Sequence, residues 1–349
     1  MDRSKPSLIR TFRLLASCGA IALIVGSVSA QDSAPSKKPS LGTIERFDPR
    51  FDKLIPPDAK IERLAEGFDW SEGPVWVAKD KALLFSDVPE NIVYRWAEGM
   101  SKPEVFLKPS GYTGSTPRGG EPGSNGLVLD PEGRLVLCQH GDRRVSRLGP
   151  DKTFVTLVDQ YEGKRLNSPN DAVYHSDGSL YFTDPPYGLI GKNDDPKKEL
   201  RFNGVYRLAP DGKLTLLTKE MTYPNGIGLS PDEKTLYVAN SDPDKAIWMA
   251  FPVQADGTIG TGRVFFDATR GVKTLKGLPD GLKVDQAGNL FATGPGGVLV
   301  FAPDGTHLGT LNTGEATANV NFGDDGSTLY ITADMYLARI KTTTKGRGF

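Results

Sequence analysis

The chain has 349 residues with 42 Lys and Arg against 43 Asp and Glu, and this balance of −1 with interspersed signs argues against an obligate nucleic-acid-binding protein. Gly and Pro make up about 19% of the chain and 38% of the residues are hydrophobic, which indicates a turn-rich globular protein rather than a disordered one. With three His and two Cys, the chain has few ligands for zinc and few thiols for catalysis, so a metal site would consist mainly of oxygen ligands.

The first thirty residues have the three parts of a secretory signal peptide. Basic residues at positions 3, 5, 10 and 13 precede an apolar stretch over 14–25, and Val28-Ser29-Ala30 fits a cleavage site. A retained membrane anchor is the alternative, but the apolar stretch is shorter than the roughly 20 residues that a spanning helix needs. We expect cleavage near Ala30 and an exported protein, periplasmic or secreted, whose mature form is not inserted in a membrane.

Cleavage changes the composition of the mature chain. It removes four basic residues and one acidic residue, which lowers the formal charge from −1 to −4, and it leaves Cys138 as the one cysteine. A chain with one cysteine forms no internal disulfide, so its stability must come from core burial, closure of the fold or a bound ion. Residues 31–55 begin with Gln-Asp-Ser-Ala-Pro-Ser-Lys-Lys-Pro-Ser and predict a flexible lead-in to a domain over 56–349.

A sequence unit recurs six times in that domain. Each unit has a polar residue, a short apolar strand, a turn of Asp, Gly or Pro, and a second β-branched or aromatic strand, which indicates a β-hairpin. Spacings of 53, 45, 55, 55 and 39 residues separate the six leading residues, which are Glu72, Asn125, Asn170, Asn225, Asp280 and Asn319. Further strands are expected over 92–96, 205–208, 246–251 and 298–301, and no long amphipathic helix pattern interrupts the units.

An all-strand repeat with a period near 50 residues predicts the blades of a β-propeller. The mature length gives six blades of about 53 residues, whereas a repeat of about 40–45 residues would give seven. The strand around Ile61–Leu64 is expected to join the last blade and close the ring, because closure removes exposed sheet edges. A β-sandwich is the alternative, but sandwiches do not repeat at this interval. The predicted fold class is therefore all-β, a six-bladed β-propeller.

The six leading residues predict a metal-binding channel at the propeller axis. In a radial arrangement the innermost strands start near the axis, which brings six oxygen-bearing side chains together. Turn chemistry explains an Asn-Gly or Asp-Gly pair, but it does not explain Glu72, a poor turn residue in register with the others. Such oxygens suit a hard cation, and Ca²⁺ fits better than Mg²⁺ because it tolerates irregular geometry, with Mn²⁺ or Zn²⁺ as further substitutes.

Five motifs resemble the senescence-marker-protein/gluconolactonase/regucalcin-like family over roughly residues 60–340. They are Glu72-Gly-Pro-Val-Trp76, Asn167-Ser-Pro-Asn-Asp171, Phe182-Thr-Asp-Pro-Pro-Tyr-Gly188, Tyr223-Pro-Asn-Gly226 and Leu278-Pro-Asp-Gly281. The resemblance implies a six-bladed propeller that holds one divalent cation, commonly Ca²⁺, and opens sugar lactones. Related propellers hydrolyse organophosphates. Carried over motif by motif, the family's metal ligands fall on Glu72, Asn170, Asn225 and Asp280.

The resemblance also assigns residues to substrate and to proton transfer. Asn125 and His140 match a segment typical of the bacterial gluconolactonase branch and are expected to bind substrate. Asp280 is expected to be the base for an attacking water, although a neighbouring cation lowers the pKa of a carboxyl and weakens it as a base. From their position at the ends of second strands, Asp184 and His140 are expected to face the same mouth and to bind substrate there, where a His also suits proton transfer near neutral pH.

Two long loops, 111–123 and 187–203, are placed to cover the mouth of the channel and to select the substrate. Arg165 and Tyr187 are expected to hydrogen-bond the hydroxyls of a sugar. We expect a small-molecule lactone as the partner and a monomer or weak oligomer. Two alternatives stay open at this point: a metal-dependent esterase or phosphotriesterase with the same site, and a non-catalytic propeller that binds a ligand over a structural ion.

Overall fold

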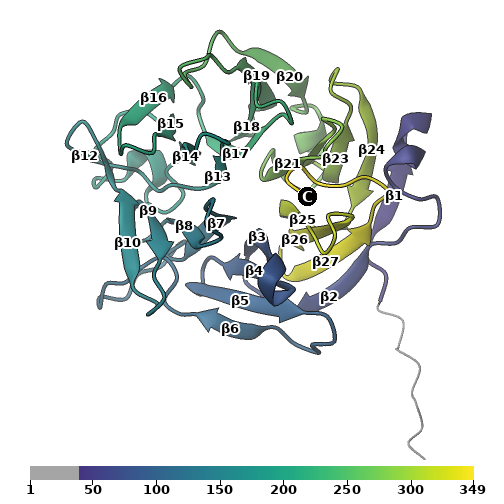
Figure 1. Cartoon of the computed structure of the whole chain (residues 1–349), viewed down its shortest axis with the longest axis horizontal. Coiled ribbons are helices and arrows are strands. Elements are labelled where there is room, and N and C mark those ends of the chain that lie inside the picture. Colours follow the sequence, from purple (N-terminus) through teal and green to yellow (C-terminus); the bar gives the residue numbers. More distant parts are fainter. Residues whose placement is uncertain (1–38) are drawn as a thin grey trace, which may run out of the picture. The chain divides into compact units, whose positions relative to one another are not determined.

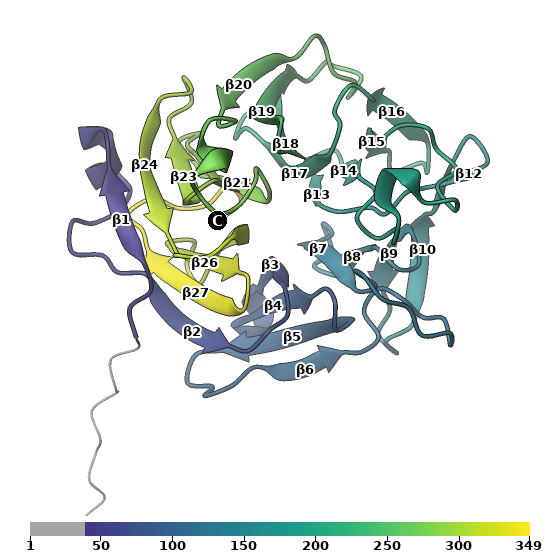
Figure 2. The ribbon, with the colours of Figure 1, turned by 180° about the vertical axis from the view of Figure 1, so that it is seen from behind.

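The computed structural model describes residues 39–349, which form six antiparallel sheets around one axis (Figures 1 and 2). Five sheets have four strands and one has five. This arrangement confirms the predicted all-β six-bladed propeller. The predicted signal peptide over 1–30 and the first part of the lead-in, 31–38, lie outside the described residues.

In the first four blades, consecutive strands run outwards from the axis. Blade 1 holds β3 (Ser71–Val77), β4 (Ala82–Asp87), β5 (Ile92–Ala97) and β6 (Glu104–Leu107). Blade 2 holds β7 (Ser124–Leu129), β8 (Leu135–Gln139), β9 (Arg144–Leu148) and β10 (Phe154–Val158). Blade 3 holds β13 (Ala172–Tyr174), β14 (Leu180–Asp184), β15 (Gly204–Leu208) and β16 (Leu214–Thr218). Blade 4 holds β17 (Pro224–Leu229), β18 (Thr235–Asp242), β19 (Lys245–Pro252) and β20 (Arg263–Asp267).

The last two blades each take their outermost strand from the N-terminal side of the chain. Blade 5 holds β21 (Leu282–Val284), β22 (Leu290–Gly294), β23 (Gly297–Phe301), β24 (His307–Asn312) and, outermost, β1 (Thr43–Arg46). Blade 6 holds β25 (Thr317–Gly323), β26 (Thr328–Ala333), β27 (Tyr336–Lys341) and β2 (Glu62–Glu66). The remaining elements are the hairpin of β11 (Gln160–Tyr161) and β12 (Lys164–Arg165) and the 3-10 helices η1 (Pro49–Lys53), η2 (Ala78–Asp80), η3 (Lys192–Asp194) and η4 (Gly271–Lys273). None of the helices in this part of the chain has the length and apolar character needed to cross a membrane.

The hydrophobic core lies between neighbouring blades. The strands β3, β4, β8, β14 and β22 are buried along their whole length, because a neighbouring blade covers each face. Between blades 1 and 6, Trp76 stacks on Tyr330 with ring centroids 5.6 Å apart and an interplanar angle of 12°. Continuous apolar runs in the inner strands therefore reflect burial on two faces rather than on one.

The ring closes where the sequence predicts. β2 pairs antiparallel with β27, and in this register Glu62 faces Arg339, whose Nε donates to Glu62 Oε2 at 2.8 Å. The last blade is thus completed by a strand that precedes the first blade, which leaves no open edge between the two ends of the sheet array.

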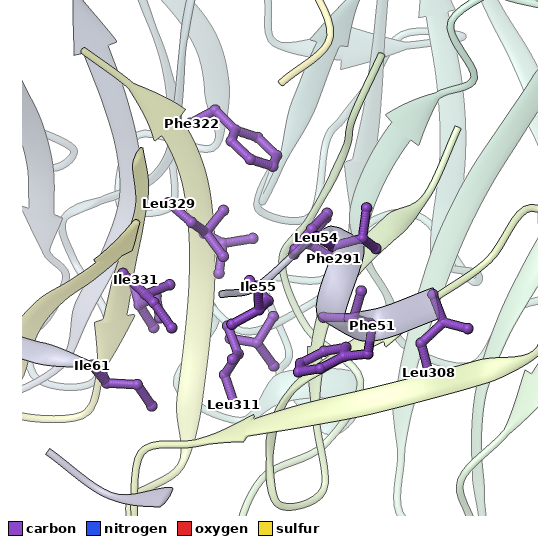
Figure 3. Close-up of a cluster of buried hydrophobic side chains, with 14 of the residues drawn as sticks. Phe51, Leu54, Ile55, Ile61, Phe291, Leu308, Leu311, Phe322, Leu329 and Ile331 are labelled. Carbon is purple, nitrogen blue, oxygen red and sulfur yellow. The ribbon is translucent and has the colours of Figure 1, made fainter. Parts of the chain in front are cut away.

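The lead-in prediction is wrong for residues 43–55. β1 pairs with β24, and η1 places Phe51, Leu54 and Ile55 in the core of blades 5 and 6 (Figure 3). Phe51 and Ile55 are 0% exposed. The alternating pattern of β1 and its single-face burial are weak sequence signals, and the polar start of the segment conceals them.

Replacing Phe51 by Ala is expected to lower the free energy of unfolding by about 3–5 kcal/mol, because the change removes a fully buried ring and leaves a cavity. Urea denaturation measures it. The matched control is Phe47→Ala in the same segment, where the ring is 58% exposed and the expected loss is below about 1 kcal/mol. Equal, small losses for both variants would mean that this segment does not pack on the blades.

Candidate active site

Five of the six leading residues line one pocket at the propeller axis, with a volume of about 470 Å³. Glu72, Asn125 and Asn225 lie in β3, β7 and β17, while Asn170 and Asp280 lie two residues before β13 and β21. Glu72 and the three Asn are buried, and Asp280 is partly exposed to the pocket. The radial fold thus brings together side chains that are more than 200 residues apart in sequence.

Local backbone geometry turns these side chains towards the axis. The pairing register of three inner strands shifts at the leading residue, over Glu72–Val75, Ser124–Leu127 and Pro224–Ile227. Such bulges bend a strand and redirect a side chain. The glycine that follows is needed because the inner strands crowd one another: a Cβ on Gly226 would lie 2.1 Å from the backbone oxygen of Asp280 in the next blade.

Hydrogen bonds orient parts of this ring of side chains. Glu72 Oε2 accepts from the backbone N–H of Gly73 at 2.5 Å and from Asn319 Nδ2 at 3.1 Å. Asn225 Nδ2 donates to Ser241 Oγ at 3.0 Å. The sixth leading residue, Asn319, therefore acts as a partner of Glu72 and does not line the pocket.

Four oxygens of the ring are buried and accept no hydrogen bond from the described residues. They are the Oδ1 atoms of Asn125, Asn170, Asn225 and Asp280. A buried polar atom without a partner costs about 1–3 kcal/mol, so four of them at one pocket indicate that a ligand supplies the missing interaction. Over residues 39–349 no three His, Cys, Asp or Glu are grouped to hold a metal, so the amide oxygens are essential to this donor set. Carboxylate and amide oxygens fit a hard cation of the Ca²⁺ type.

The charges of the site also favour a bound cation. Burial raises the pKa of Glu72, and the nearby charge of Asp171 adds to this rise. Burial also raises the pKa of Asp280 well above its usual range, and the charges of Glu72, Asp171 and Glu121 push it further. Lys283 opposes part of this repulsion, with Nζ 3.9 Å from Asp171 Oδ2. A bound cation would stabilise the ionised forms of these carboxyls.

The walls of the pocket differ in polarity. Tyr187, Lys192 and Ser241 contribute polar groups, and Tyr187 stacks on Tyr223 with ring centroids 5.8 Å apart. The Lys192 ammonium lies 5.9 Å from the centre of the Tyr187 ring. Apolar side chains complete the wall, and they are Trp70, Pro243, Val272, Leu275, Leu278 and Ala316. The cavity therefore offers polar donors and an apolar surface to one ligand.

Of the five residues predicted to bind substrate, Asn125 and Tyr187 line the pocket, whereas His140, Asp184 and Arg165 do not. The Asp184 carboxylate accepts the backbone N–H groups of Asn167 and Ser168, both at 2.8 Å, and burial raises its pKa to about 7. Asp184 thus holds the segment that leads to Asn170.

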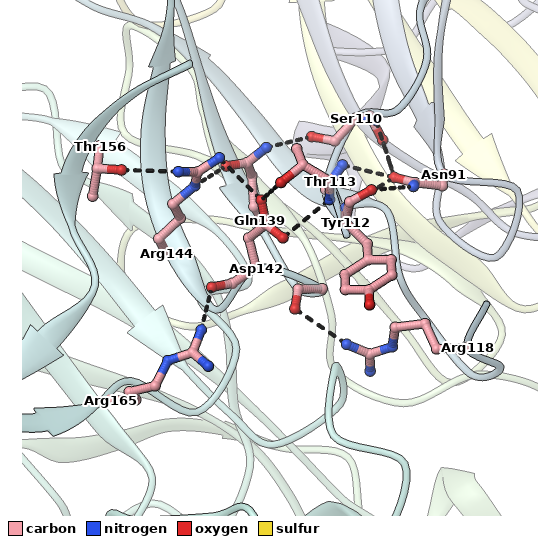
Figure 4. Close-up of polar contacts among 12 residues, drawn as sticks. Asn91, Ser110, Tyr112, Thr113, Arg118, Gln139, Asp142, Arg144, Thr156 and Arg165 are labelled. Carbon is pink, nitrogen blue, oxygen red and sulfur yellow. Dashed lines mark hydrogen bonds and ion pairs between the residues drawn. The ribbon is translucent and has the colours of Figure 1, made fainter. Parts of the chain in front are cut away.

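The other two lie away from the pocket for different reasons. Arg165 is exposed in β12 and donates to the backbone oxygen of Asp142 at 2.8 Å (Figure 4). His140 is fully buried behind the pocket wall, where its Nδ1 lies 3.1 Å from Glu121 Oε2. The prediction placed Asp184 and His140 at the mouth because both end second strands, but both side chains are fully buried and neither lines the pocket.

Sequence reasoning missed two acidic residues of the site. Glu121 lines the pocket from the loop between β6 and β7, and Asp171 is buried next to Asn170. Asp171 stands inside one of the five motifs, which was an available signal. Glu121 does not occupy a position of the sequence repeat. The available signal was the predicted place of its loop over the mouth of the channel.

Comparisons with known proteins show the family to which the chain belongs. The family model described as SMP-30/gluconolactonase/LRE-like region matches residues 70–334. The chain belongs to this family. It is 42% identical over 348 residues to a gluconolactonase of Zymomonas mobilis, covering 95% of both chains.

Two further relatives show the range of proteins to which this member of the SMP-30/gluconolactonase family is similar. A solved structure of a gluconolactonase from Xanthomonas campestris superposes with a TM-score of 0.76 at 33% identity and covers 90% of this chain and 99% of its own. A diisopropyl-fluorophosphatase of Loligo vulgaris is 23% identical over 190 residues, which is 52% of this chain and 59% of that protein. Three of the four residues with unpartnered oxygens, Asn170, Asn225 and Asp280, are positions at which the motifs place the family's metal ligands.

In the presence of a chelator, the free energy of unfolding is expected to fall as the pH rises above about 4. The raised pKa values of Glu72 and Asp280 mean that the folded state holds protons that the unfolded state has lost, so their stabilising effect disappears as the pH passes the folded-state values. Ca²⁺ at about 100 times its Kd should add about 2.7 kcal/mol at pH 8. Urea denaturation from pH 5 to 9, with and without Ca²⁺, measures both effects.

The variant Glu72→Gln separates these contributions. Under chelation at pH 8 it should be at least as stable as the wild type, because it removes a buried like charge, but it should lose most of the Ca²⁺ effect. Glu315→Gln, whose carboxylate pairs with Lys276 outside the pocket, is the control and should keep that effect. A Ca²⁺ effect that is equal in all three proteins would place the cation elsewhere.

Proposed function

We propose that the chain is a divalent-cation-dependent hydrolase that opens sugar lactones, with Ca²⁺ as the preferred ion. The observation that carries this proposal is the set of unpartnered buried oxygens of Asn125, Asn170, Asn225 and Asp280 beside Glu72 in one pocket. The family membership and the 42% identical gluconolactonase support a lactone-hydrolysing enzyme.

Glu72, Asn170, Asn225 and Asp280 are the residues that would hold the cation, and Mg²⁺, Mn²⁺ or Zn²⁺ are possible substitutes. When bound, a divalent cation polarises the ester carbonyl and stabilises the oxyanion that forms on it, which is worth several kcal/mol. The protein contributes the orientation: Asn319 and Ser241 fix the side chains of Glu72 and Asn225, so the pocket needs little rearrangement during the reaction.

The polar wall favours a sugar lactone as substrate. Lys192, Ser241 and the Tyr187 hydroxyl line the pocket and can hydrogen-bond ring hydroxyls, while Asn125 adds an amide. A hydroxyl-binding site discriminates strongly against analogues that lack the hydroxyl, because its polar groups are then left without partners. An aldonolactone such as gluconolactone meets these requirements.

The apolar wall favours a second candidate, a metal-dependent esterase or phosphotriesterase that uses the same cation. Val272, Leu275 and Leu278 give part of the pocket lining an apolar character. The similarity to a diisopropyl-fluorophosphatase also supports this second candidate. Hydrophobic esters would bind there without using the polar donors.

A pH-stat assay on aldonolactones, aliphatic lactones and phosphotriesters, with and without chelator, tests the proposal. We expect turnover to be greatest with an aldonolactone and to be lost on chelation. Asp280→Ala and Glu72→Gln should lower kcat/KM by at least about 100-fold, which corresponds to about 2.7 kcal/mol.

Folded variants with wild-type rates would refute the assigned site. Faster turnover of phosphotriesters would favour the second candidate. A chelator that lowers the melting temperature of a protein without activity on any of these substrates would favour the non-catalytic alternative.

We also propose export, on the basis of the sequence of residues 1–30. Expression of the full chain in a bacterial host should yield protein outside the cytoplasm whose first residue, by Edman sequencing, is Gln31. A chain that keeps Met1 in the cytoplasmic fraction would contradict this.

A further inference from the structure

The loop between β6 and β7 carries a carboxylate into the pocket that is not part of the ring. Glu121 lines the pocket, its side chain is 35% exposed, and its charge is felt by Asp280 and by Tyr187. It comes from neither an inner strand nor a repeat position. It is therefore a carboxylate available to a bound molecule but separate from the candidate cation ligands.

A buried imidazole lies directly against this carboxylate. His140 follows β8, its side chain is 0% exposed, and Nδ1 lies 3.1 Å from Glu121 Oε2. Neither ring nitrogen makes an aligned hydrogen bond with any of the described residues, so the carboxylate is the close polar neighbour of this ring. Hydrogen bonds of catalytic pairs are often poorly aligned without substrate and tighten in the complex.

The backbone holds the pair together from both sides. His140 N donates to Gly123 O at 3.1 Å, and Gly141 N donates to Pro122 O at 3.2 Å. On the far side the chain passes at Gly188, where a Cβ would lie only 2.6 Å from His140 Cβ. The imidazole is thus enclosed between two loops and has little room to turn.

The loop that carries Glu121 is itself anchored at several points. Asn91 Oδ1 accepts the backbone N–H groups of Ser110, Gly111 and Tyr112, at 3.0, 2.7 and 3.2 Å (Figure 4). Arg118 donates to the backbone oxygens of Gly141 and Gly188. These bonds fix the residues that precede Glu121 to blades 1, 2 and 3. A reacting group requires such a fixed position.

We propose that Glu121, positioned by His140, is the group that takes the proton of the attacking water in lactone hydrolysis. This inference rests on the proposed function. The sequence assigned this role to Asp280, but a carboxylate that coordinates a cation becomes a weak base, because the cation stabilises its ionised form. Glu121 stands outside the ligand set and faces the same cavity.

The water oxygen forms a bond to the carbonyl carbon of the lactone while one water proton passes to Glu121 Oε. The bond between that carbon and the ring oxygen then breaks, and the proton on Glu121 passes to the departing ring oxygen, which becomes a hydroxyl. The products are an open-chain hydroxy acid, ionised in solution, and the unchanged Glu121–His140 pair.

The variant Glu121→Gln tests the role of the carboxylate, because Gln keeps the size and a polar contact to His140 but cannot accept the proton. We expect kcat on the best lactone to fall about 100-fold or more, with KM within about threefold and the Ca²⁺-induced stabilisation unchanged. Glu315→Gln, at a carboxylate of similar exposure outside the pocket, is the matched control and should keep wild-type kcat. A Glu121→Gln variant with wild-type kcat would overturn the proposal.

Chemical rescue separates proton transfer from packing. Glu121→Ala leaves space for a small carboxylate, so formate should raise its kcat in a saturable manner and should not affect Glu121→Gln, in which the space is filled. A Glu121→Ala variant that is inactive and unaffected by formate, together with an altered Ca²⁺ effect, would assign Glu121 a purely structural role and contradict the proposal.

A double-mutant cycle tests His140 as the positioning residue. His140→Gln should lower kcat in the wild-type background but not further in the Glu121→Gln background, because it acts through the carboxylate. Additive losses would contradict this part. The proposed function fails separately, and first, if the wild-type protein hydrolyses no lactone.

Discussion

The central physical constraint in this propeller is the burial of several oxygen-bearing side chains at the axis where the inner strands converge. Glu72 and three Asn residues are buried there, and Asp280 joins them at the pocket. Like charges and unpartnered acceptors at one point oppose folding, and the fold accommodates them with bulged strands, a glycine at close approach and partial neutralisation by Lys283. Packing between blades supplies the stability that this arrangement needs.

Much of the fold could be predicted because the repeated sequence unit indicates both the hairpins and their spacing along the chain. A polar residue leads each unit and is followed by glycine in four of the six, so the repeat period predicted the number of blades and the leading residues predicted most of the site. Closure by a strand before the first blade followed from the physics of exposed sheet edges, and β2 confirms it. The segment containing Phe51 could not be placed, because β1 is only partly buried on one face and the 3-10 helix η1 is too short to give a periodic signal.

The site residues could be predicted where they occupy repeat positions, and not where they lie elsewhere. Residues at repeat positions, such as Asn125 and Asn225, line the pocket as the radial argument expects. Residues chosen for chemistry at strand ends, Asp184 and His140, do not line it, because the direction of a side chain depends on blade twist and local hydrogen bonds. Glu121 reaches the pocket through a loop whose path depends on tertiary contacts that the sequence pattern does not encode.

We propose that the ring of oxygens at the propeller axis holds one hard cation. A crystal structure grown with Ca²⁺, with anomalous data at long wavelength, tests it most directly. We expect one anomalous peak at the axis, about 2.3–2.6 Å from Glu72 and from the Oδ1 atoms of Asn170, Asn225 and Asp280. A ring that contains only water, or a cation bound outside this pocket, would contradict it.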